Sequence, residues 1–229
     1  MRGWFGRSPE RQREKAAARV APGALADYLA APFPDPATPV DDVEFLALDV
    51  ETTGLDPARD HVLAVGWVPV IGGRVVLAGA DSRVVAAPVD VGDSATIHRI
   101  TDDEVAAGTP WDDVVDHVLA ALTGRVLLAH FARIETGFLS RACDLRWGQS
   151  LPVRVVDTLE LASRLVTDST HGDPEPGALR LWSARERHGL PAYTAHDPLV
   201  DALSCAELFL AQVAEIGRGG PVPLKRVMT

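Results

Sequence analysis

The chain has 229 residues, of which 47% are hydrophobic, and its formal net charge is −10 at pH 7. This length and apolar content are enough to bury a substantial core in one globular domain with extensions. The acidic balance argues against a protein that coats long nucleic acids through a broad basic face, and no segment is long and apolar enough to cross a membrane.

The first twenty residues are basic in an otherwise acidic chain. They hold six basic and two acidic side chains, a net charge of +4, which leaves −14 for the remainder. We expect a basic helix here, followed by a Pro-rich linker over residues 31–36. This extension is an arm for nucleic acid, a docking segment for a protein partner through residues 1–40, or a solvated helix packed against the domain.

The apolar run of residues 45–48 predicts a buried strand, and two carboxylates follow at its end. Because side chains alternate along a strand, Asp49 and Glu51 project to the same side while Leu46 and Leu48 point into the core. Their repulsion is unfavourable unless a cation lies between them, and Mg²⁺ prefers oxygen ligands. Taken alone, such a pair is also typical of a solvated strand end.

The elements that follow predict an α/β fold. Thr101 and Glu104 have the spacing of a capping box, and Pro110 opens the next helix. Three consecutive strands followed by helix-strand alternation indicate a mixed five-stranded sheet flanked by helices. We expect strands near 44–50, 62–69, 73–79, 125–129 and 153–156, and helices near 102–107 and 110–122.

Glu135 lies on the helix that follows the strand near 125–129. Apolar residues recur at helical spacing around it, so that Glu135 falls beside the apolar stripe instead of on the solvated face. A carboxylate in that position needs a partner. The partner is either a metal ion or a surface arginine, with Arg141 and Arg146 as candidates.

A third group of polar residues opens the last long helix. Asp197 is a good N-cap and Pro198 a good first helical residue, which aims His196 and Asp201 at one cleft. The alternative is an exposed loop histidine and an aspartate favoured by the helix dipole. The polar segment 167–177 is expected to be a mobile loop near the site. Helices are predicted near 157–166, 178–188 and 198–215.

Cys143 and Cys205 both fall in predicted helices without the spacing of metal ligands. We expect buried free thiols in a reducing compartment. Since no signal peptide opens the chain, we expect a cytoplasmic protein that does not associate with a membrane.

Ordered motifs connect these clusters. Residues 49–54 read Asp-x-Glu-Thr-Thr-Gly and residues 196–201 read His-x-x-x-x-Asp, while 97–101 read Ile-His-Arg-Ile-Thr and 156–161 contain Asp-Thr-Leu. From about residue 44 to 213, this set resembles the DEDD family of 3′-5′ exonucleases, in the branch with a catalytic His (DEDDh) that includes the proofreading epsilon subunit of bacterial DNA polymerase III.

One motif departs from the family pattern. The family's second motif usually reads His-Asn-x-x-Phe-Asp, whereas this chain has Phe131 in place of Asn and Glu135 in place of Asp. Glu keeps the charge and adds one methylene, so a displaced carboxylate would lower Mg²⁺ affinity or shift the preference toward Mn²⁺. We hypothesise that Glu135 remains a functional ligand.

The resemblance implies a ribonuclease H-like domain over residues 44–216, after an extension at 1–43 and before a tail at 217–229. All four carboxylates would lie at one end of the sheet and hold two Mg²⁺ ions about 4 Å apart, with Mn²⁺ able to substitute. These ligands would be Asp49, Glu51, Glu135 and Asp201.

The resemblance also implies a general base. An imidazole has an ordinary pKa of about 6.5, which suits His196 to this role.

The resemblance also implies a substrate. The expected activity releases nucleoside 5′-monophosphates from single-stranded or frayed 3′ ends, with DNA favoured. His98 and His130 either contact a phosphate or nucleotide or have structural roles. An exoribonuclease, or a catalytically weak module that binds nucleic-acid ends or docks a partner, are the alternatives. The terminal nucleotide would be held by Thr52, Thr53, Gly54 and Leu55.

Overall fold

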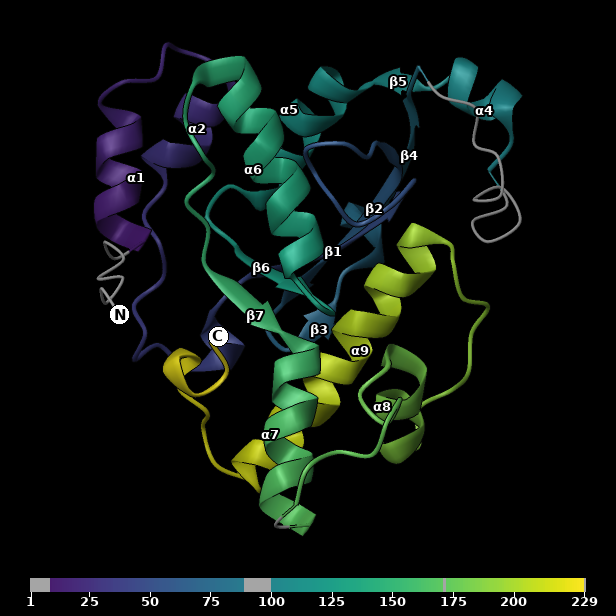
Figure 1. The fold of residues 1–229 in the computed structure, drawn as a ribbon. Coiled ribbons are helices and arrows are strands. Elements are labelled where there is room, and N and C mark those ends of the chain that lie inside the picture. The colour runs from purple at the N-terminus through teal and green to yellow at the C-terminus, as the bar shows by residue number, and fades with distance from the viewer. Residues whose placement is uncertain (1–8, 89–99, 171, 229) are drawn as a thin grey trace, which may run out of the picture.

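The computed structural model describes residues 9–88, 100–170 and 172–228. Its centre is a mixed sheet of seven strands in the order β5-β4-β2-β1-β6-β7, with β3 paired to β2 (Figure 1). The strands are β1 (Phe45–Thr52), β2 (Val62–Ile71), β3 (Arg74–Val75), β4 (Asp81–Ala86), β5 (Thr109–Pro110), β6 (Val126–Ala129) and β7 (Val155–Asp157).

Strand β1 lies in the middle of the sheet, antiparallel to β2 and parallel to β6. Its side chains alternate as predicted: Leu46, Leu48 and Val50 belong to one core cluster, whereas Phe45 and Ala47 belong to another. Both faces of the strand are therefore covered, which explains why its sequence is a continuous apolar run up to Asp49.

Helices cover both faces of the sheet. Residues of α2, α5 and α6 build the core on one face, and residues of α7, α9 and the C-terminal segment build the core on the other. Figure 1 shows α8 on the outer side of α9. The α-helices are α1 (Pro9–Ala17), α2 (Ala24–Ala30), α4 (Asp102–Ala106), α5 (Trp111–Leu122), α6 (Arg133–Trp147), α7 (Thr158–Thr170), α8 (Leu181–Arg187) and α9 (Pro198–Gly217).

The prediction of five strands was wrong, although the fold class is confirmed. Gly72 and Gly73 form a two-residue hairpin turn with φ of 58° and 67°, and the predicted strand over 73–79 reduces to the two residues of β3. Strand β4 was missed because its first three residues are Asp, Ser and Arg and most of it is only half-buried. Strand β5 is a two-residue pairing with β4.

Two helix boundaries also differ from the prediction. Helix α7 continues to Thr170, so that part of the expected loop over 167–177 is helical. The helix predicted near 178–188 is shortened to Leu181–Arg187, and Gly189 follows it with a φ of 66°. The capping box of Thr101 and Glu104 is present at the start of α4.

The N-terminal extension packs against the domain. Arg13 of α1 donates to the carbonyls of Leu29 at 2.6 Å and Ala31 at 2.8 Å, and the Tyr28 hydroxyl donates to the Pro152 carbonyl at 2.9 Å. These contacts fit the packed-helix alternative for the described part of the extension. The division of the chain at residue 43 stays a prediction.

The end of the Pro-rich linker and the residues that follow it, 36–40, are hydrogen-bonded to the C-terminal segment. The amide of Val40 donates to the Val222 carbonyl, and the amides of Leu224 and Lys225 donate to the carbonyls of Thr38 and Pro36, each at 2.8 Å.

Among the helices of the described chain, none combines the length and hydropathy that a bilayer crossing requires.

Candidate active site

The first two acidic residues lie at the C-terminal end of β1. Asp49 pairs in register with Gly66 of β2, and Glu51 pairs with Ala64. Glu51 is 5% exposed, so that its carboxylate is buried beneath the neighbouring elements. The alternative of a solvated strand end is therefore wrong for Glu51.

Gly66 allows helix α9 to approach the sheet. A Cβ atom at this position would lie 2.3 Å from the Leu199 amide nitrogen and 2.4 Å from the Pro198 carbonyl carbon. Only glycine permits this contact without moving the helix. The close approach carries Asp201, on the first turn of α9, to the carboxylates of β1.

The start of α9 has the predicted cap. Asp197 Oδ1 accepts hydrogen bonds from the amides of Leu199 at 3.0 Å and Val200 at 3.2 Å. His196, immediately before the cap, has a φ of 67°, and its amide donates to Asp201 Oδ2 at 2.9 Å. The left-handed turn thus links the backbone of His196 to the carboxylate of Asp201.

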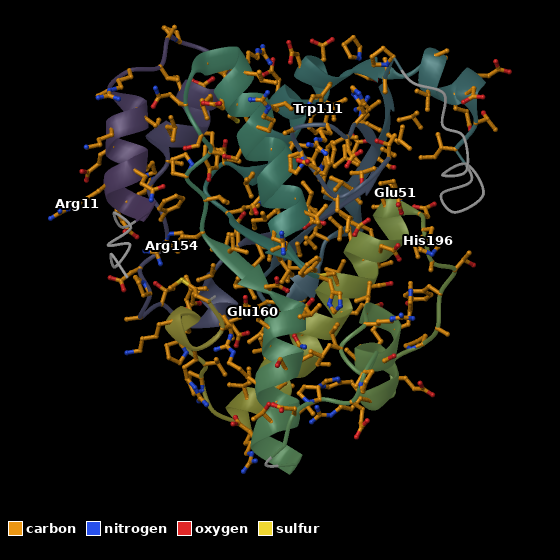
Figure 2. All side chains as sticks on the ribbon, in the orientation of Figure 1. Arg11, Glu51, Trp111, Arg154, Glu160 and His196 are labelled. Carbon is orange, nitrogen blue, oxygen red and sulfur yellow. The ribbon has the colours of Figure 1, made fainter. Side chains whose placement is uncertain are left out.

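These elements bring three predicted residues together. Potential ligand atoms of Glu51, His196 and Asp201 all lie within 4.8 Å of one another. Figure 2 shows Glu51 and His196 on the same flank of the molecule. The spacing His-x-x-x-x-Asp therefore places an imidazole and a carboxylate at one site, as predicted.

A buried arginine anchors the segment that leads to His196. Arg185 of α8 is 1% exposed and donates to the Pro191 carbonyl at 2.8 Å, the Ser204 carbonyl at 2.7 Å and Glu207 Oε2 at 2.8 Å. Its guanidinium lies over the Tyr193 ring, 4.8 Å from the centroid, and the Tyr193 hydroxyl donates to Glu207 Oε1 at 3.0 Å. Residues three and five positions before His196 are thereby held against α8 and α9.

Glu135 is delivered by the first turn of α6. The turn before this helix is held by Asp157, which accepts hydrogen bonds from the amides of Phe131 at 2.9 Å and Ala132 at 2.8 Å. Phe131 has a φ of 72°, a left-handed conformation that is uncommon for a bulky residue. Asp157 also accepts the amide of Leu159 at 2.9 Å, so that one carboxylate holds the starts of both α6 and α7.

The arginine alternative for Glu135 is wrong. Arg146 forms a two-point ion pair with Asp116, at 2.8 and 2.9 Å, and Arg141 lies 3.8 Å from Asp144. Glu135 is 3% exposed, and its Oε2 atom is buried with no hydrogen-bond partner in the described chain.

The electrostatics of the cluster favour a cation. Burial raises the pKa of Asp49 well above its ordinary value, and neighbouring carboxylates raise it further, Glu135 foremost. Burial also raises the pKa of Glu135 to about 8 and that of Asp201 to about 6. Asp201 Oδ1, like Glu135 Oε2, is buried and has no hydrogen-bond partner among the described residues. Carboxylates of this kind are the donors that Mg²⁺ and Mn²⁺ bind, so the residues fit a metal site.

A hollow of about 360 Å³ opens beside the carboxylates. Its wall includes the four residues predicted to hold a terminal nucleotide, which follow Glu51 directly. Leu55 is 70% exposed at this wall, and Gly54 lies where any Cβ atom would approach the Asp60 carboxylate to 2.5 Å. The hollow is lined by Asp49, Val50, Glu51, Thr52, Thr53, Gly54, Leu55, His130, Ile134 and Glu135.

The two additional histidines have different outcomes. His98 lies outside the described residues. His130 borders the hollow, but its Nδ1 lies 2.9 Å from Thr158 Oγ1 and its Nε2 donates to the Leu179 carbonyl at 2.9 Å. Burial lowers the pKa of His130 to about 4, while the Asp157 charge opposes this shift. These contacts fit the structural alternative for His130.

Sequence reasoning missed three residues that position the site: Gly66, Asp157 and Arg185. A glycine inside an apolar strand often marks a close backbone approach, so Gly66 had a recognisable signal. Asp157 belongs to the Asp-Thr-Leu segment, whose role the pattern did not reveal. Arg185 has no local signal, because its contacts come from later segments of the chain.

The chain is similar to known exonucleases. A family model described as Exonuclease matches residues 46–209. The DNA polymerase III subunit epsilon of Treponema pallidum is 30% identical over 179 residues, covering 75% of this chain and 77% of that protein. The epsilon-like protein of Rhodobacter capsulatus is 28% identical over 84% of this chain, which spans only 27% of that relative.

Solved structures share the ribonuclease H-like fold. The nuclease domain of 3′hExo, a DEDDh family member bound to rAMP, has a TM-score of 0.62 at 13% identity and covers 78% of this chain and 95% of that chain. Cell-death related nuclease 4 has a TM-score of 0.63 at 12% identity, covering 75% and 64%. The chain therefore belongs to the exonuclease family.

Proposed function

We propose that this protein is a metal-dependent 3′-5′ exonuclease that releases nucleoside 5′-monophosphates from single-stranded or frayed DNA ends. The observation that carries the proposal is the cluster of Glu51, His196 and Asp201, with ligand atoms within 4.8 Å of one another. Buried oxygens on Asp201 and Glu135 that have no hydrogen-bond partner among the described residues add to it, because such groups are costly to bury without a partner.

Exonucleases of this family use divalent metal ions. The four acidic residues would hold two Mg²⁺ ions, with Mn²⁺ able to substitute; bound ions of this kind stabilise negative charge on the phosphate and the leaving oxygen. Glu135 is proposed as a ligand despite its extra methylene, because its Oε2 atom is buried without a hydrogen-bond partner among the described residues. Of the neighbouring charges, that of Glu135 contributes most to the raised pKa of Asp49. The acidic residues in this role are Asp49, Glu51, Glu135 and Asp201.

His196 would accept the proton of the attacking water. A ring nitrogen of its imidazole lies within 4.8 Å of a carboxylate oxygen of Asp201 and of Glu51. The amide of His196 is bonded to Asp201, and the preceding segment is anchored by Arg185, so the ring is presented from a constrained turn.

The substrate end would occupy the hollow beside the carboxylates, against the segment from Thr52 to Leu55. The names of the epsilon relatives support DNA as substrate and a polymerase as partner. A second candidate is an exoribonuclease, because a structural neighbour was solved with rAMP bound. Nothing in the carboxylate cluster itself discriminates a 2′-hydroxyl.

The test is degradation of matched 3′-labelled and 5′-labelled single-stranded DNA and RNA oligonucleotides with Mg²⁺ or Mn²⁺. Asp49→Ala, verified as folded by circular dichroism, is the control. We expect loss of nucleotides from the 3′ end by the wild type alone, with DNA degraded faster. Faster degradation of RNA would support the exoribonuclease, and no hydrolysis of any substrate would contradict the proposal in favour of a binding module.

A second readout does not depend on turnover. Ions that bind only the folded state raise its stability, by about 2.7 kcal/mol when their concentration is 100 times the dissociation constant. We expect Mn²⁺ to raise the thermal unfolding temperature of the wild type more than that of Asp49→Ala.

A further inference from the structure

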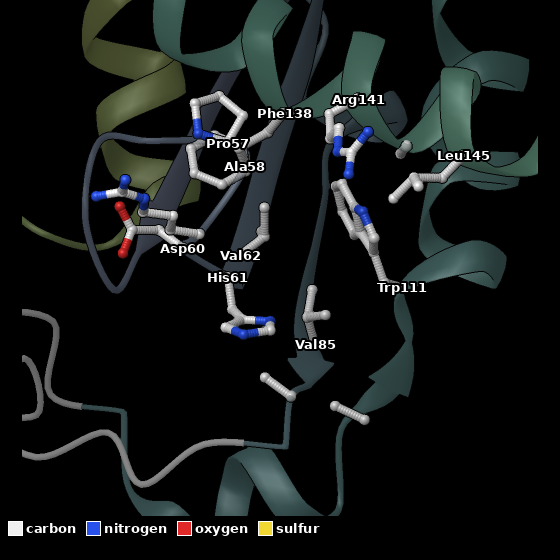
Figure 3. A pocket seen from close by; sticks show the side chains of 14 residues that line it. Pro57, Ala58, Asp60, His61, Val62, Val85, Trp111, Phe138, Arg141 and Leu145 are labelled. Atoms are coloured by element: carbon white, nitrogen blue, oxygen red, sulfur yellow. The ribbon is translucent and has the colours of Figure 1, made fainter. Parts of the chain in front are cut away.

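A second hollow, of about 270 Å³, lies outside the acidic cluster (Figure 3). Figure 3 shows Trp111 beside Arg141 on one side of it, and Pro57 and His61 on the other. The wall combines an aromatic ring and apolar side chains with cationic ones. It is formed by Pro57, Ala58, Arg59, Asp60, His61, Val62, Val85, Ala86, Ala87, Trp111, Phe138, Arg141, Ala142 and Leu145.

The two hollows share the same pair of walls. On helix α6, Ile134 lines the hollow beside the carboxylates and Phe138 lines the second one. Four helical residues correspond to a rise of about 6 Å, so the hollows follow one another along the helix. On the facing loop, Leu55 lines the first hollow and Pro57 the second.

The shared loop is held in place at both ends. The Thr53 amide donates to the His61 carbonyl at 2.9 Å, and the His61 amide donates to Thr53 Oγ1 at 3.0 Å. Pro57 packs on α6 where Gly137 leaves room, since a Cβ atom at Gly137 would lie 2.9 Å from Pro57 Cγ. The second hollow therefore continues the hollow beside the carboxylates, between the same loop and helix α6.

The charge of the second hollow differs from that of the chain as a whole. Two arginines and a histidine line it against one acidic residue, Asp60, although the protein carries a net charge of −10. The arginines have only loose ion pairs: Arg59 lies 3.6 Å from Asp56, and Arg141 lies 3.8 Å from Asp144. Their side chains are 86% and 43% exposed, respectively, so both are accessible to a phosphate.

We propose that the second hollow binds a nucleotide of the substrate strand upstream of the one being removed. Trp111 would stack on its base, and Arg141 and Arg59 would contact its phosphates. Sites for single-stranded nucleic acid combine aromatic platforms with cationic grooves in this way, and a polyanion matches the local charge. The inference rests on the proposed exonuclease function and adds a subsite that extends its contact with the strand.

The test compares oligonucleotides of increasing length. Trp111→Ala removes the stacking surface, and Arg141→Gln changes an exposed side chain that can be replaced without disturbing the core. Arg11→Gln is the matched control, because it removes the same charge from an exposed position of α1, well separated from Trp111 (Figure 2). Binding of a nucleoside 5′-monophosphate and of single-stranded DNA of two to eight nucleotides is measured by fluorescence anisotropy in an Asp49→Ala background, and hydrolysis is measured without that change.

We expect Trp111→Ala and Arg141→Gln to weaken binding of the oligonucleotides about tenfold, within the range for loss of one stacked base, and to leave the binding of a nucleoside 5′-monophosphate unchanged, because it fills only the hollow beside the carboxylates. Arg11→Gln should bind every length as well as its parent. Equal binding by Arg141→Gln and its parent at every length would overturn the subsite, even with hydrolysis intact. Absence of hydrolysis by the wild type would instead overturn the proposed function, while the binding series still decides whether the hollow contacts the strand.

Discussion

Substitution of Gly66 by alanine tests how the site is assembled. The added methyl group would lie 2.3 Å from the Leu199 amide nitrogen and 2.4 Å from the Pro198 carbonyl carbon. Both distances are about 1 Å short of ordinary contact, and neither partner is a flexible side-chain tip. The start of α9 must therefore move away from β2 by about 1 Å, and Asp201 and His196 must move with it.

A displacement of this size has a predictable cost. A misplacement of about 1 Å in a catalytic group lowers the rate about 100-fold, whereas overpacking of this kind costs about 1–3 kcal/mol of stability. We expect Gly66→Ala to remain folded but to degrade DNA about 100-fold more slowly than the wild type. The assay is single-turnover degradation of a 5′-labelled single-stranded oligonucleotide, beside urea unfolding of the same samples.

The matched control is Gly220→Ala. A Cβ atom at Gly220 has its nearest neighbour at 3.7 Å, which is ordinary contact, so this substitution should change neither rate nor stability by a measurable amount. A Gly66→Ala protein with the wild-type rate would show that α9 does not need this contact to place its two residues, and the reasoning would be refuted.

Three further substitutions test individual residues. Glu135→Asp restores the family's usual carboxylate and should keep the rate within about tenfold, whereas Glu135→Ala should lose about 100-fold or more; equal rates for Glu135→Ala and the wild type would remove Glu135 from the ligand set. Asp157→Ala leaves three amides without their acceptor and should cost about 2–4 kcal/mol in urea unfolding, and a cost below about 0.5 kcal/mol would contradict its role at both helix starts. Burial lowers the pKa of His130 to about 4, so as the pH falls the unfolded chain takes up the proton before the folded chain does. The contribution of His130 to the free energy of unfolding is therefore full above pH ~6.5 and falls by about 3 kcal/mol as the pH drops to ~4. His130→Gln should lose less stability between pH 7.5 and 4.5, and identical losses in the two proteins would refute the assignment.

Local patterns predicted the parts of the site that depend on neighbouring residues in sequence. The apolar run before Asp49 located β1, and Asp197-Pro198 located the start of α9 with its cap. Spacing also placed His196 and Asp201 together, because a single helical turn connects them. These features require only strand alternation and helix capping.

The remaining features depend on contacts between distant segments. Strand β4 is stabilised by pairing with β2 more than by its own composition, so its polar start concealed it. Whether Glu135 faced an arginine or the acidic cluster was undecided in the sequence, since both lay within reach of its helix. In the structure, Arg146 forms an ion pair with Asp116 of another helix and is not the partner of Glu135.

The turn before α6 has an evolutionary consequence. Asp157 holds this turn through the main-chain amides of Phe131 and Ala132, which every residue type except proline provides. The family's usual asparagine tolerates the left-handed conformation well, and phenylalanine adopts it here at a cost of about 1–3 kcal/mol that the amide contacts offset. The start of the helix that carries Glu135 therefore depends on main-chain amides at positions 131 and 132 and not on the side chain at position 131.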